Sequence, residues 1–198
     1  MSSTTANPSA RRTELLEAAY QYVLRHGLAG LSLRPLAEAI GSSTRVLMFL
    51  FGNKDGLVRA LLERARTEEL ALMAGLRRPE RPVDLATAAQ EVWTWLAADA
   101  HRPLLRLWAE AYARSLVDPD GPWAGFARST VEDWLDVLAG CQPQAERDTE
   151  EIVARRTLTL AVLRGALLDL LATGDESRVT GAVHQQLALL RGAEGTGD

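Results

Sequence analysis

Apolar residues recur three and four positions apart along most of the chain, and glycine or proline separates one run from the next. Side chains with this spacing lie on one face of a helix, so each run predicts an amphipathic helix. We therefore expect an all-α fold of about nine helices. Three short helices should form an N-terminal domain, and a fourth should join them to a larger C-terminal helical bundle.

Residues 31–57 contain two short apolar runs that are separated by a tight turn. The Ser32 hydroxyl can cap the first helix, and Gly41 can end it because glycine adopts a positive φ without a Cβ clash. We expect the second helix to open at Ser42 or Ser43. Its first turn then holds the polar and basic residues Ser43, Thr44 and Arg45. A short basic helix tip can read base edges in a major groove, although such helix pairs are also common in other all-α proteins.

A set of apolar, glycine and polar positions covers roughly the first third of the chain: Leu16, Ala19, Gly27, Leu31, Ser32, Leu33, Leu36, Ala37, Gly41, Ser43, Phe51, Gly52, Asn53, Lys54 and Leu57. This pattern resembles the DNA-binding domain of the TetR family of bacterial transcription regulators. The resemblance implies a ligand-responsive regulator, most often a repressor, that binds a pseudo-palindromic operator as a homodimer. It departs from the family at Met48, Phe49 and Leu50, where the family usually carries a Tyr and often a His that touch phosphates. The alternative is a helical small-molecule-binding or interaction protein whose N-terminal helix-turn-helix domain, called the head below, no longer binds DNA.

The charge of the chain is divided in a way that suits DNA binding. Residues 1–66 carry a net charge of +4 and residues 67–198 a net charge of -8, within a total of -4. A basic head attracts phosphates, whereas the acidic remainder is repelled by them. Lys54 opposes the helix dipole at an expected helix start, which a nearby phosphate would explain and a surface lysine would also allow. The candidate DNA-binding residues are Ser32, Arg34, Ser43, Thr44, Arg45 and Lys54.

The composition of the chain and the positions of its glycines and prolines predict four segments. Residues 1–10 are small and polar and form an expected disordered arm, and residues 11–53 form the helix-turn-helix domain. Residues 54–192 form the effector-binding and dimerisation domain, and residues 193–198 a disordered tail. Arg11 and Arg12 either reach a minor groove or simply begin the first helix.

All five tryptophans lie between Pro82 and Gly140. Core packing explains such a concentration, and so does an apolar pocket for a small molecule, which the family resemblance favours. The candidate ligand-binding residues are Trp95, Trp108, Tyr112 and Trp134. Asp169 is a lone charge in an apolar run, so it must be exposed, paired or matched to a cationic ligand.

Residues 158–172 are apolar on nearly every side, so the helix that they predict must be covered on two faces. A last helix, with Ser177 as its expected cap, carries a second apolar stripe. Together these helices could pack against the same pair of a second copy, or be consumed by the core of their own chain. The candidate dimer residues are Leu163, Leu167, Leu170, Val183, Leu187 and Leu190.

Composition and motifs exclude several other classes of protein. Hydrophobic residues make up 47% of the chain, which supports a packed core, and the single cysteine, Cys141, cannot form an internal disulfide. No signal peptide or membrane helix is predicted, so we expect a cytoplasmic protein without a membrane partner. His26, His101 and His184 are scattered, and no catalytic, metal-binding or phosphate-binding motif is present. We therefore expect no enzymatic activity, no metal site and no cofactor.

Overall fold

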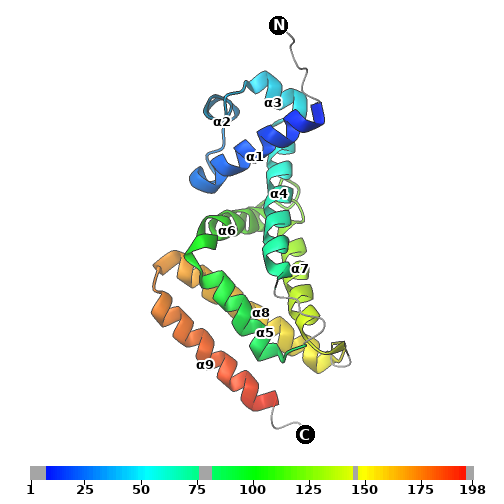
Figure 1. Ribbon diagram of the computed structural model, residues 1–198, viewed down its shortest axis with the longest axis vertical. Helices are drawn as coiled ribbons and strands as arrows, with labels where there is room; N and C mark the ends of the chain where they lie inside the picture. Colours follow the sequence, from blue (N-terminus) through cyan, green and yellow to red (C-terminus); the bar gives the residue numbers. More distant parts are fainter. Residues whose placement is uncertain (1–7, 76–81, 145–146, 195–198) are drawn as a thin grey trace. The chain divides into compact units, whose positions relative to one another are not determined.

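The computed structural model describes residues 8–75, 82–144 and 147–194 (Figure 1). Over these ranges the chain forms nine α-helices, one 3-10 helix and no strand, which confirms the predicted all-α fold. The elements are α1 (Pro8–His26), α2 (Leu33–Ala39), α3 (Thr44–Phe51), α4 (Lys54–Ala74), α5 (Leu85–Ala97), η1 (Asp99–His101), α6 (Arg102–Val117), α7 (Phe126–Cys141), α8 (Glu150–Thr173) and α9 (Glu176–Glu194). Residues 8–10 are therefore helical, whereas the rest of the expected arm and residues 195–198 of the expected tail lie outside the described residues.

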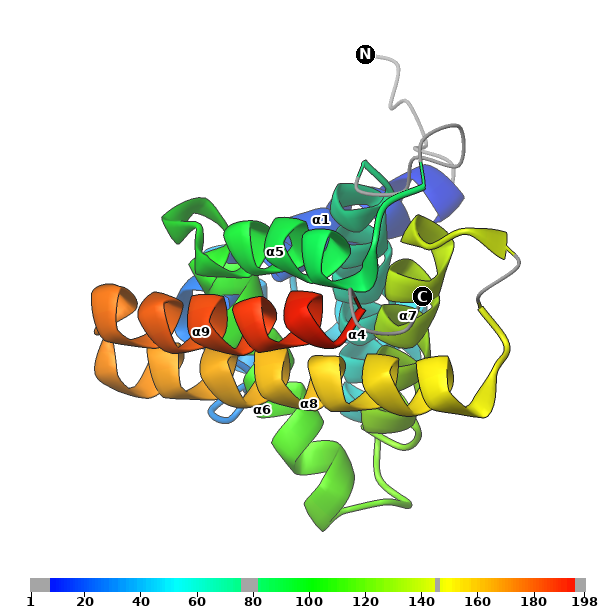
Figure 2. The same cartoon turned by 90° about the horizontal axis from the view of Figure 1, so that it is seen from below.

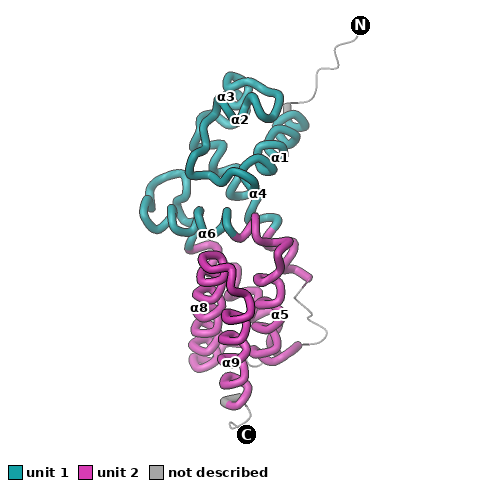
Figure 3. Tube along the Cα trace, turned by 90° about the vertical axis from the view of Figure 1, so that its left-hand side faces the viewer, with its two compact units in different colours: residues 1–68, 106–127 teal, residues 69–105, 128–198 magenta. Residues whose placement is uncertain are grey.

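The helices form two compact units (Figure 3). Unit 1 contains the described residues up to 68 together with residues 106–127, and unit 2 contains residues 69–105 and 128–198 where these are described. The helices α4, α6 and α7 each contribute residues to both units. This division follows packing, and the functional boundary expected after residue 53 stays a prediction.

Polar side chains cap the N-termini of several helices. They accept hydrogen bonds from backbone N–H groups that have no partner within the helix. Asp84 accepts from Thr87 N at 2.7 Å and caps α5, and Thr149 accepts from Ile152 N at 3.3 Å and caps α8. Asp175 accepts from Arg178 N at 3.1 Å and caps α9, so the expectation for Ser177 was wrong.

The core of unit 1 is built from the inner faces of its helices. Leu15, Ala19, Tyr20, Leu36, Leu47, Leu57 and Leu61 are all fully or almost fully buried. The Arg64 guanidinium lies 4.6 Å from the centroid of the Tyr20 ring and forms ion pairs with Glu17 at 2.8 Å and Glu68 at 2.7 Å. Burial raises the pKa of Tyr20 above its ordinary value, and the hydrogen bond from Arg64 lowers that of Glu17. These contacts fix α4 against α1 through both apolar and ionic interactions.

In unit 2, α5, α8 and α9 pack side by side (Figure 2). Their shared core contains Trp93, Leu163, Leu167, Leu170, Val183 and Leu187. Trp93 Nε1 donates to Thr180 Oγ1 at 3.1 Å, which satisfies the indole N–H of a buried ring.

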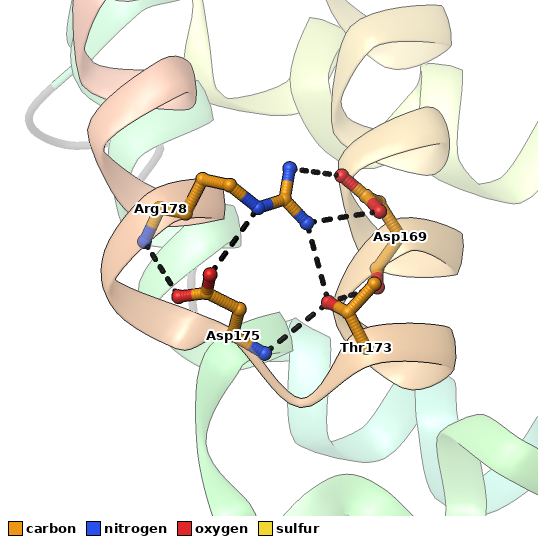
Figure 4. A network of polar contacts seen from close by, with 4 residues as sticks. All are labelled: Asp169, Thr173, Asp175 and Arg178. Atoms are coloured by element: carbon orange, nitrogen blue, oxygen red, sulfur yellow. Dashed lines mark hydrogen bonds and ion pairs between the residues drawn. The ribbon is translucent and has the colours of Figure 1, made fainter.

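The connection from α8 to α9 is held by a small polar network (Figure 4). Arg178 donates to the two carboxylate oxygens of Asp169 at 2.9 and 3.1 Å, and Gly174 ends α8 at a φ of +68°. Asp169 is therefore both paired and partly exposed, which are two of the three alternatives that the sequence left open. The hydrogen bond from Arg178 lowers the pKa of the Asp169 carboxyl group.

Candidate nucleic-acid interface

The candidate interface is built on α2 and α3 and on the turns that flank α3. Gly41 has a φ of +63° and ends α2, and Ser42 N donates to Ala37 O at 2.8 Å. Ser43 then caps α3, because its Oγ accepts from Val46 N at 3.2 Å. The predicted start of this helix is confirmed. Ser32 occupies the N-cap position of α2, but its side chain makes no cap bond, so that expectation was wrong.

Helix α3 has one buried and one exposed face. Leu47 and Phe51 are four residues apart and point into the core of unit 1. Arg45 and Phe49, on the opposite side, are exposed. Because buried side chains fix the rotation of the helix, the exposed face is presented in a defined direction.

The turn after α3 fixes the start of α4. Gly52 has a φ of +81°, a conformation that favours glycine. Asn53 Oδ1 accepts from Gly56 N at 2.8 Å, which places Lys54 as the first residue of α4. This turn places the exposed lysine at a fixed position relative to α3.

All six candidate DNA-binding residues belong to unit 1. Thr44 is half-buried, and the five exposed residues are Ser32, Arg34, Ser43, Arg45 and Lys54. Within the described part of the chain, the three cations of this set form no ion pair. Their charges are therefore available to an external anion.

The two arginines near the N-terminus lie within α1. Arg11 pairs with Glu14 at 2.7 Å, and the Arg12 guanidinium lies 5.0 Å from the centroid of the Phe51 ring. Both side chains are thus engaged by unit 1, as expected of a helix start.

Comparison with known proteins agrees with this geometry. The family model of the bacterial regulatory proteins of the tetR family matches residues 15–61, which run from α1 into α4 and include the whole helix-turn-helix. The helix-turn-helix segment of the chain therefore matches the tetR family. Among curated relatives, the HTH-type transcriptional regulator BetI of Burkholderia thailandensis is 26% identical over 114 residues. This match covers 55% of the chain and 56% of BetI, so the chain spans little more than half the length of the curated relatives it matches.

Solved structures extend the likeness in fold over most of the chain. A transcriptional regulator from Rhodococcus sp. Rha1 has a TM-score of 0.70 at 23% identity and covers 91% of this chain, with 96% of its own length matched. The multidrug binding protein EbrR, in complex with imidazole, has a TM-score of 0.65 at 26% identity, with 88% of this chain and 93% of EbrR matched. EbrR has also been solved with proflavin and with malachite green.

The four candidate ligand-binding aromatics are divided between the two units. In unit 1 the rings of Trp108 and Tyr112 lie 5.1 Å apart. In unit 2 Trp95 stacks on His101 at 4.4 Å, and Trp134 Nε1 donates to Glu69 Oε1 at 2.7 Å. The three tryptophans are buried, so each contributes to the core of its unit. Their role in ligand binding stays a prediction.

Sequence reasoning missed a surface groove of about 450 Å³ between α5 and α9 in unit 2. Gln90 Nε2 and His184 Nε2 lie 3.1 Å apart along this groove, and Thr180 and Trp93 also line it. His184 and Gln90 are far apart in the sequence and belong to no recognisable motif, so only the packing of the two helices brings them together.

The candidate dimer residues are placed differently from the expectation. Leu163, Leu167, Leu170, Val183 and Leu187 are buried in the core of their own chain, and Leu190 is half-buried. The side chains of the five buried residues are therefore not available to a second copy. On the other side of the same helices the apolar residues Leu158, Leu168 and Leu189 are exposed.

Other chemistry receives no support from the described residues. No three His, Cys, Asp or Glu side chains in the described ranges are grouped so that they could hold a metal ion. No described helix is long and apolar enough to cross a membrane. The Cys141 thiol is buried and donates to Val137 O at 3.3 Å, as a structural thiol does.

Proposed function

We propose that this protein is a DNA-binding transcriptional regulator that acts as a repressor, and that α3 is its recognition helix. The observation that carries the proposal is the exposed Arg45 in the first turn of α3, on a helix whose opposite face is anchored by Leu47 and Phe51. A basic side chain on a rigid, short helix is suited to the major groove, which admits an α-helix.

The proposed contacts follow from side-chain chemistry. Arg45 can bind the O6 and N7 atoms of guanine with two hydrogen bonds, and Ser43 and Thr44 can reach bases or the adjacent backbone. Arg34, Lys54 and the Ser32 hydroxyl, which makes no cap bond, are proposed to bind phosphates. Such contacts would fix the position of the helix-turn-helix domain on the duplex. The charge of +4 over residues 1–66 supports such binding.

We also propose that the protein acts as a homodimer. Two recognition helices about 34 Å apart, or a multiple of that distance, enter successive major grooves on one side of DNA, and a second copy supplies the second helix. The exposed stripe of α8 contains small and apolar residues at spacings of three and four: Ala154, Leu158, Ala161, Gly165, Leu168 and Ala172. Its own chain covers only the opposite face of α8. The exposed apolar stripe can therefore pack against α8 and α9 of a second copy.

Regulation is proposed to come from a small organic effector. EbrR, a structural neighbour at 26% identity, has been solved with imidazole and with proflavin, and this supports an organic ligand without naming it for this chain. The effector must bind the DNA-incompetent arrangement more tightly than the competent one, because equal affinity shifts no population. The proposed action needs no catalytic step or cofactor, and the cytoplasm, where operator DNA lies, is its proposed compartment.

Salt-dependent binding to duplex DNA tests the proposal. The wild-type protein and Arg45→Ala are titrated with the intergenic DNA next to the gene at several salt concentrations, with Arg128→Ala as the matched control. Arg128 is an exposed arginine of α7 in unit 2. The logarithm of the binding constant should fall with the logarithm of salt, with a slope near -0.9 for each phosphate neutralised. Arg45→Ala should lose about 1–3 kcal/mol of binding free energy, and Arg128→Ala should lose none. Absence of salt-dependent binding would favour an interaction protein with a degenerate head.

Effector coupling needs a separate measurement. Tryptophan fluorescence titrated with malachite green, a ligand of the neighbour EbrR, reports binding, and the affinity for DNA is then measured with and without the dye. A titration of the same DNA with the dye alone corrects for direct binding. A dye that binds the protein without changing its DNA affinity would argue against coupling by this class of compound.

A further inference from the structure

The exposed face of α3 is unusually apolar for a helix in water. Phe49 is 81% exposed and Met48 is 50% exposed, and Val46 beside them is also exposed. These side chains project from an eight-residue helix whose inner face already supplies the buried anchors Leu47 and Phe51. Packing within unit 1 therefore does not explain a phenylalanine at position 49.

Phe49 shares its face of the helix with the candidate base-reading arginine. Arg45 and Phe49 are four residues apart, and Arg45 and Met48 are three apart, so all three side chains lie on one side of α3. The helix rises by 1.5 Å per residue, which separates Arg45 and Phe49 by about 6 Å along its axis. Any surface that receives Arg45 therefore also meets Phe49 about one turn later.

The major groove offers one apolar group to such a side chain, the C5-methyl group of thymine. Guanine, cytosine and adenine carry no methyl group at that edge and are read there through hydrogen-bond donors and acceptors. We propose that Phe49, assisted by Met48, contacts thymine methyl groups in the major groove and makes the operator specific for thymine next to the base pair that Arg45 contacts. The proposal rests on the proposed DNA-binding function and names the base class that this face recognises.

The spacing of the two contacts restricts the operator further. Successive base pairs of a duplex are about 3.4 Å apart, so an axial separation of about 6 Å corresponds to one or two base-pair steps. Each half-site should therefore contain a guanine and, within two base pairs of it, a thymine on either strand. Burying one methyl group changes an equilibrium constant by about fourfold.

A protein partner could also cover an exposed phenylalanine, but the surrounding charge favours DNA. Arg45, Arg34 and Lys54 form no ion pair with the described residues, and residues 1–66 carry a net charge of +4. An occupant of this face must therefore combine negative charge with small apolar groups, which is the chemistry of a duplex that contains thymine.

Replacing thymidine by deoxyuridine tests the contact. Their bases, thymine and uracil, differ only by the C5-methyl group and pair alike with adenine. Binding duplexes are first selected from a random pool by the wild-type protein. Each thymine of the selected site is then replaced in turn, and the affinity is measured by fluorescence anisotropy for the wild type, for Phe49→Ala and for Leu116→Ala. Leu116 is an exposed leucine of α6 in the same unit and serves as the control.

We expect replacement of one or two thymines near the conserved guanine of the selected site to weaken wild-type binding by about fourfold each. The same replacement should leave the affinity of Phe49→Ala unchanged, whereas Leu116→Ala should behave as the wild type. Any effect of deoxyuridine on DNA shape persists in Phe49→Ala, so the comparison isolates the methyl contact. Since Phe49 is exposed, its replacement does not threaten folding, and circular dichroism confirms this for the variant used.

Two results would overturn the inference while leaving DNA binding intact: a selected duplex that tolerates every replacement of thymine, or an equal loss from deoxyuridine in the wild type and in Phe49→Ala. A change of molecular mass in Phe49→Ala, with no change in DNA affinity, would also overturn it in favour of a protein contact. Failure to retain any duplex from the pool at low salt would instead refute the proposed function itself.

Discussion

Glu110 of α6 accepts a hydrogen bond from the backbone N–H of Leu28 through its Oε2 atom, at 2.9 Å. Leu28 lies in the turn that follows α1, and Gly27 beside it has a φ of +74°. A Cβ atom at Gly27 would lie 3.2 Å from the same carboxylate oxygen. The carboxylate therefore joins two segments of unit 1 that are 82 residues apart, and the glycine leaves room for it.

Removal of this acceptor should destabilise unit 1. Glu110→Ala leaves a partly buried N–H group without a partner, which costs about 1–3 kcal/mol. Glu110→Gln should cost less, because the amide oxygen can still accept although the bond is no longer assisted by charge. Urea denaturation followed by circular dichroism measures both. Glu132→Gln, an exposed position of α7, is the control, and equal stability of Glu110→Ala and wild type would contradict the assignment.

Gly56 is required by the close approach of α4 to the end of α3. A Cβ atom at this position would lie 2.0 Å from the carbonyl oxygen of Phe51, so the backbone must shift to admit one. We expect Gly56→Ala to lose about 1–3 kcal/mol of stability, despite the better helix propensity of alanine, and to weaken DNA binding because α3 is displaced. Thermal unfolding and the DNA titration measure the two effects. Gly30→Ala, which meets no atom within 4 Å, should be harmless by both measures.

The Asp169–Arg178 pair should make stability depend on pH in a defined direction. Because the hydrogen bond from Arg178 lowers the pKa of Asp169 in the folded chain, its stabilisation is fully present above the ordinary aspartate pKa of about 3.9. It is lost as the pH falls through the lowered value. The wild type should therefore exceed Asp169→Asn in stability at pH 7, and the difference should shrink below about pH 4. Denaturation curves at both pH values, with Asp136→Asn as an exposed control, check the trend. A difference that grows in acid would show that the sign is wrong.

The sequence predicted the head better than the rest of the chain, for physical reasons. The start of α3 is determined locally by Ser43, and the end of α2 by Gly41, so short-range chemistry was enough. The same local reasoning was wrong for the expected caps Ser32 and Ser177. A neighbouring Asp175 is a better acceptor for the first turn of α9, and the Ser32 hydroxyl forms no cap bond.

Long-range packing limited the remaining predictions. An apolar stripe shows that a helix face is buried, but it does not show whether its own chain or a partner buries it. Leu163 and Leu187 belong to the stripe that their own chain covers, and Leu158 belongs to the one left exposed. The groove beside His184 and the division of the aromatic residues between two units likewise depend on contacts between distant segments.

The exposed side of α8 and α9 leads to the last prediction. Leu158 is 59% exposed and Leu189 is 65% exposed, so neither stabilises the isolated chain appreciably. If a second copy covers them, Leu158→Glu with Leu168→Glu should place charges in an apolar interface and yield folded monomers. Leu116→Glu, an equally apolar and exposed position of α6, should leave the dimer intact.

Sedimentation equilibrium measures the mass of each variant, and circular dichroism shows whether it is folded. The monomeric variant should also bind the palindromic DNA more weakly, because one head can engage only one half-site at a time. By contrast, Leu187→Ala should lower stability by about 2–5 kcal/mol in either assembly state, since that side chain is buried in its own chain. A dimer that persists in the double variant would show that other residues join the two copies, since the charged side chains could not remain in an apolar interface.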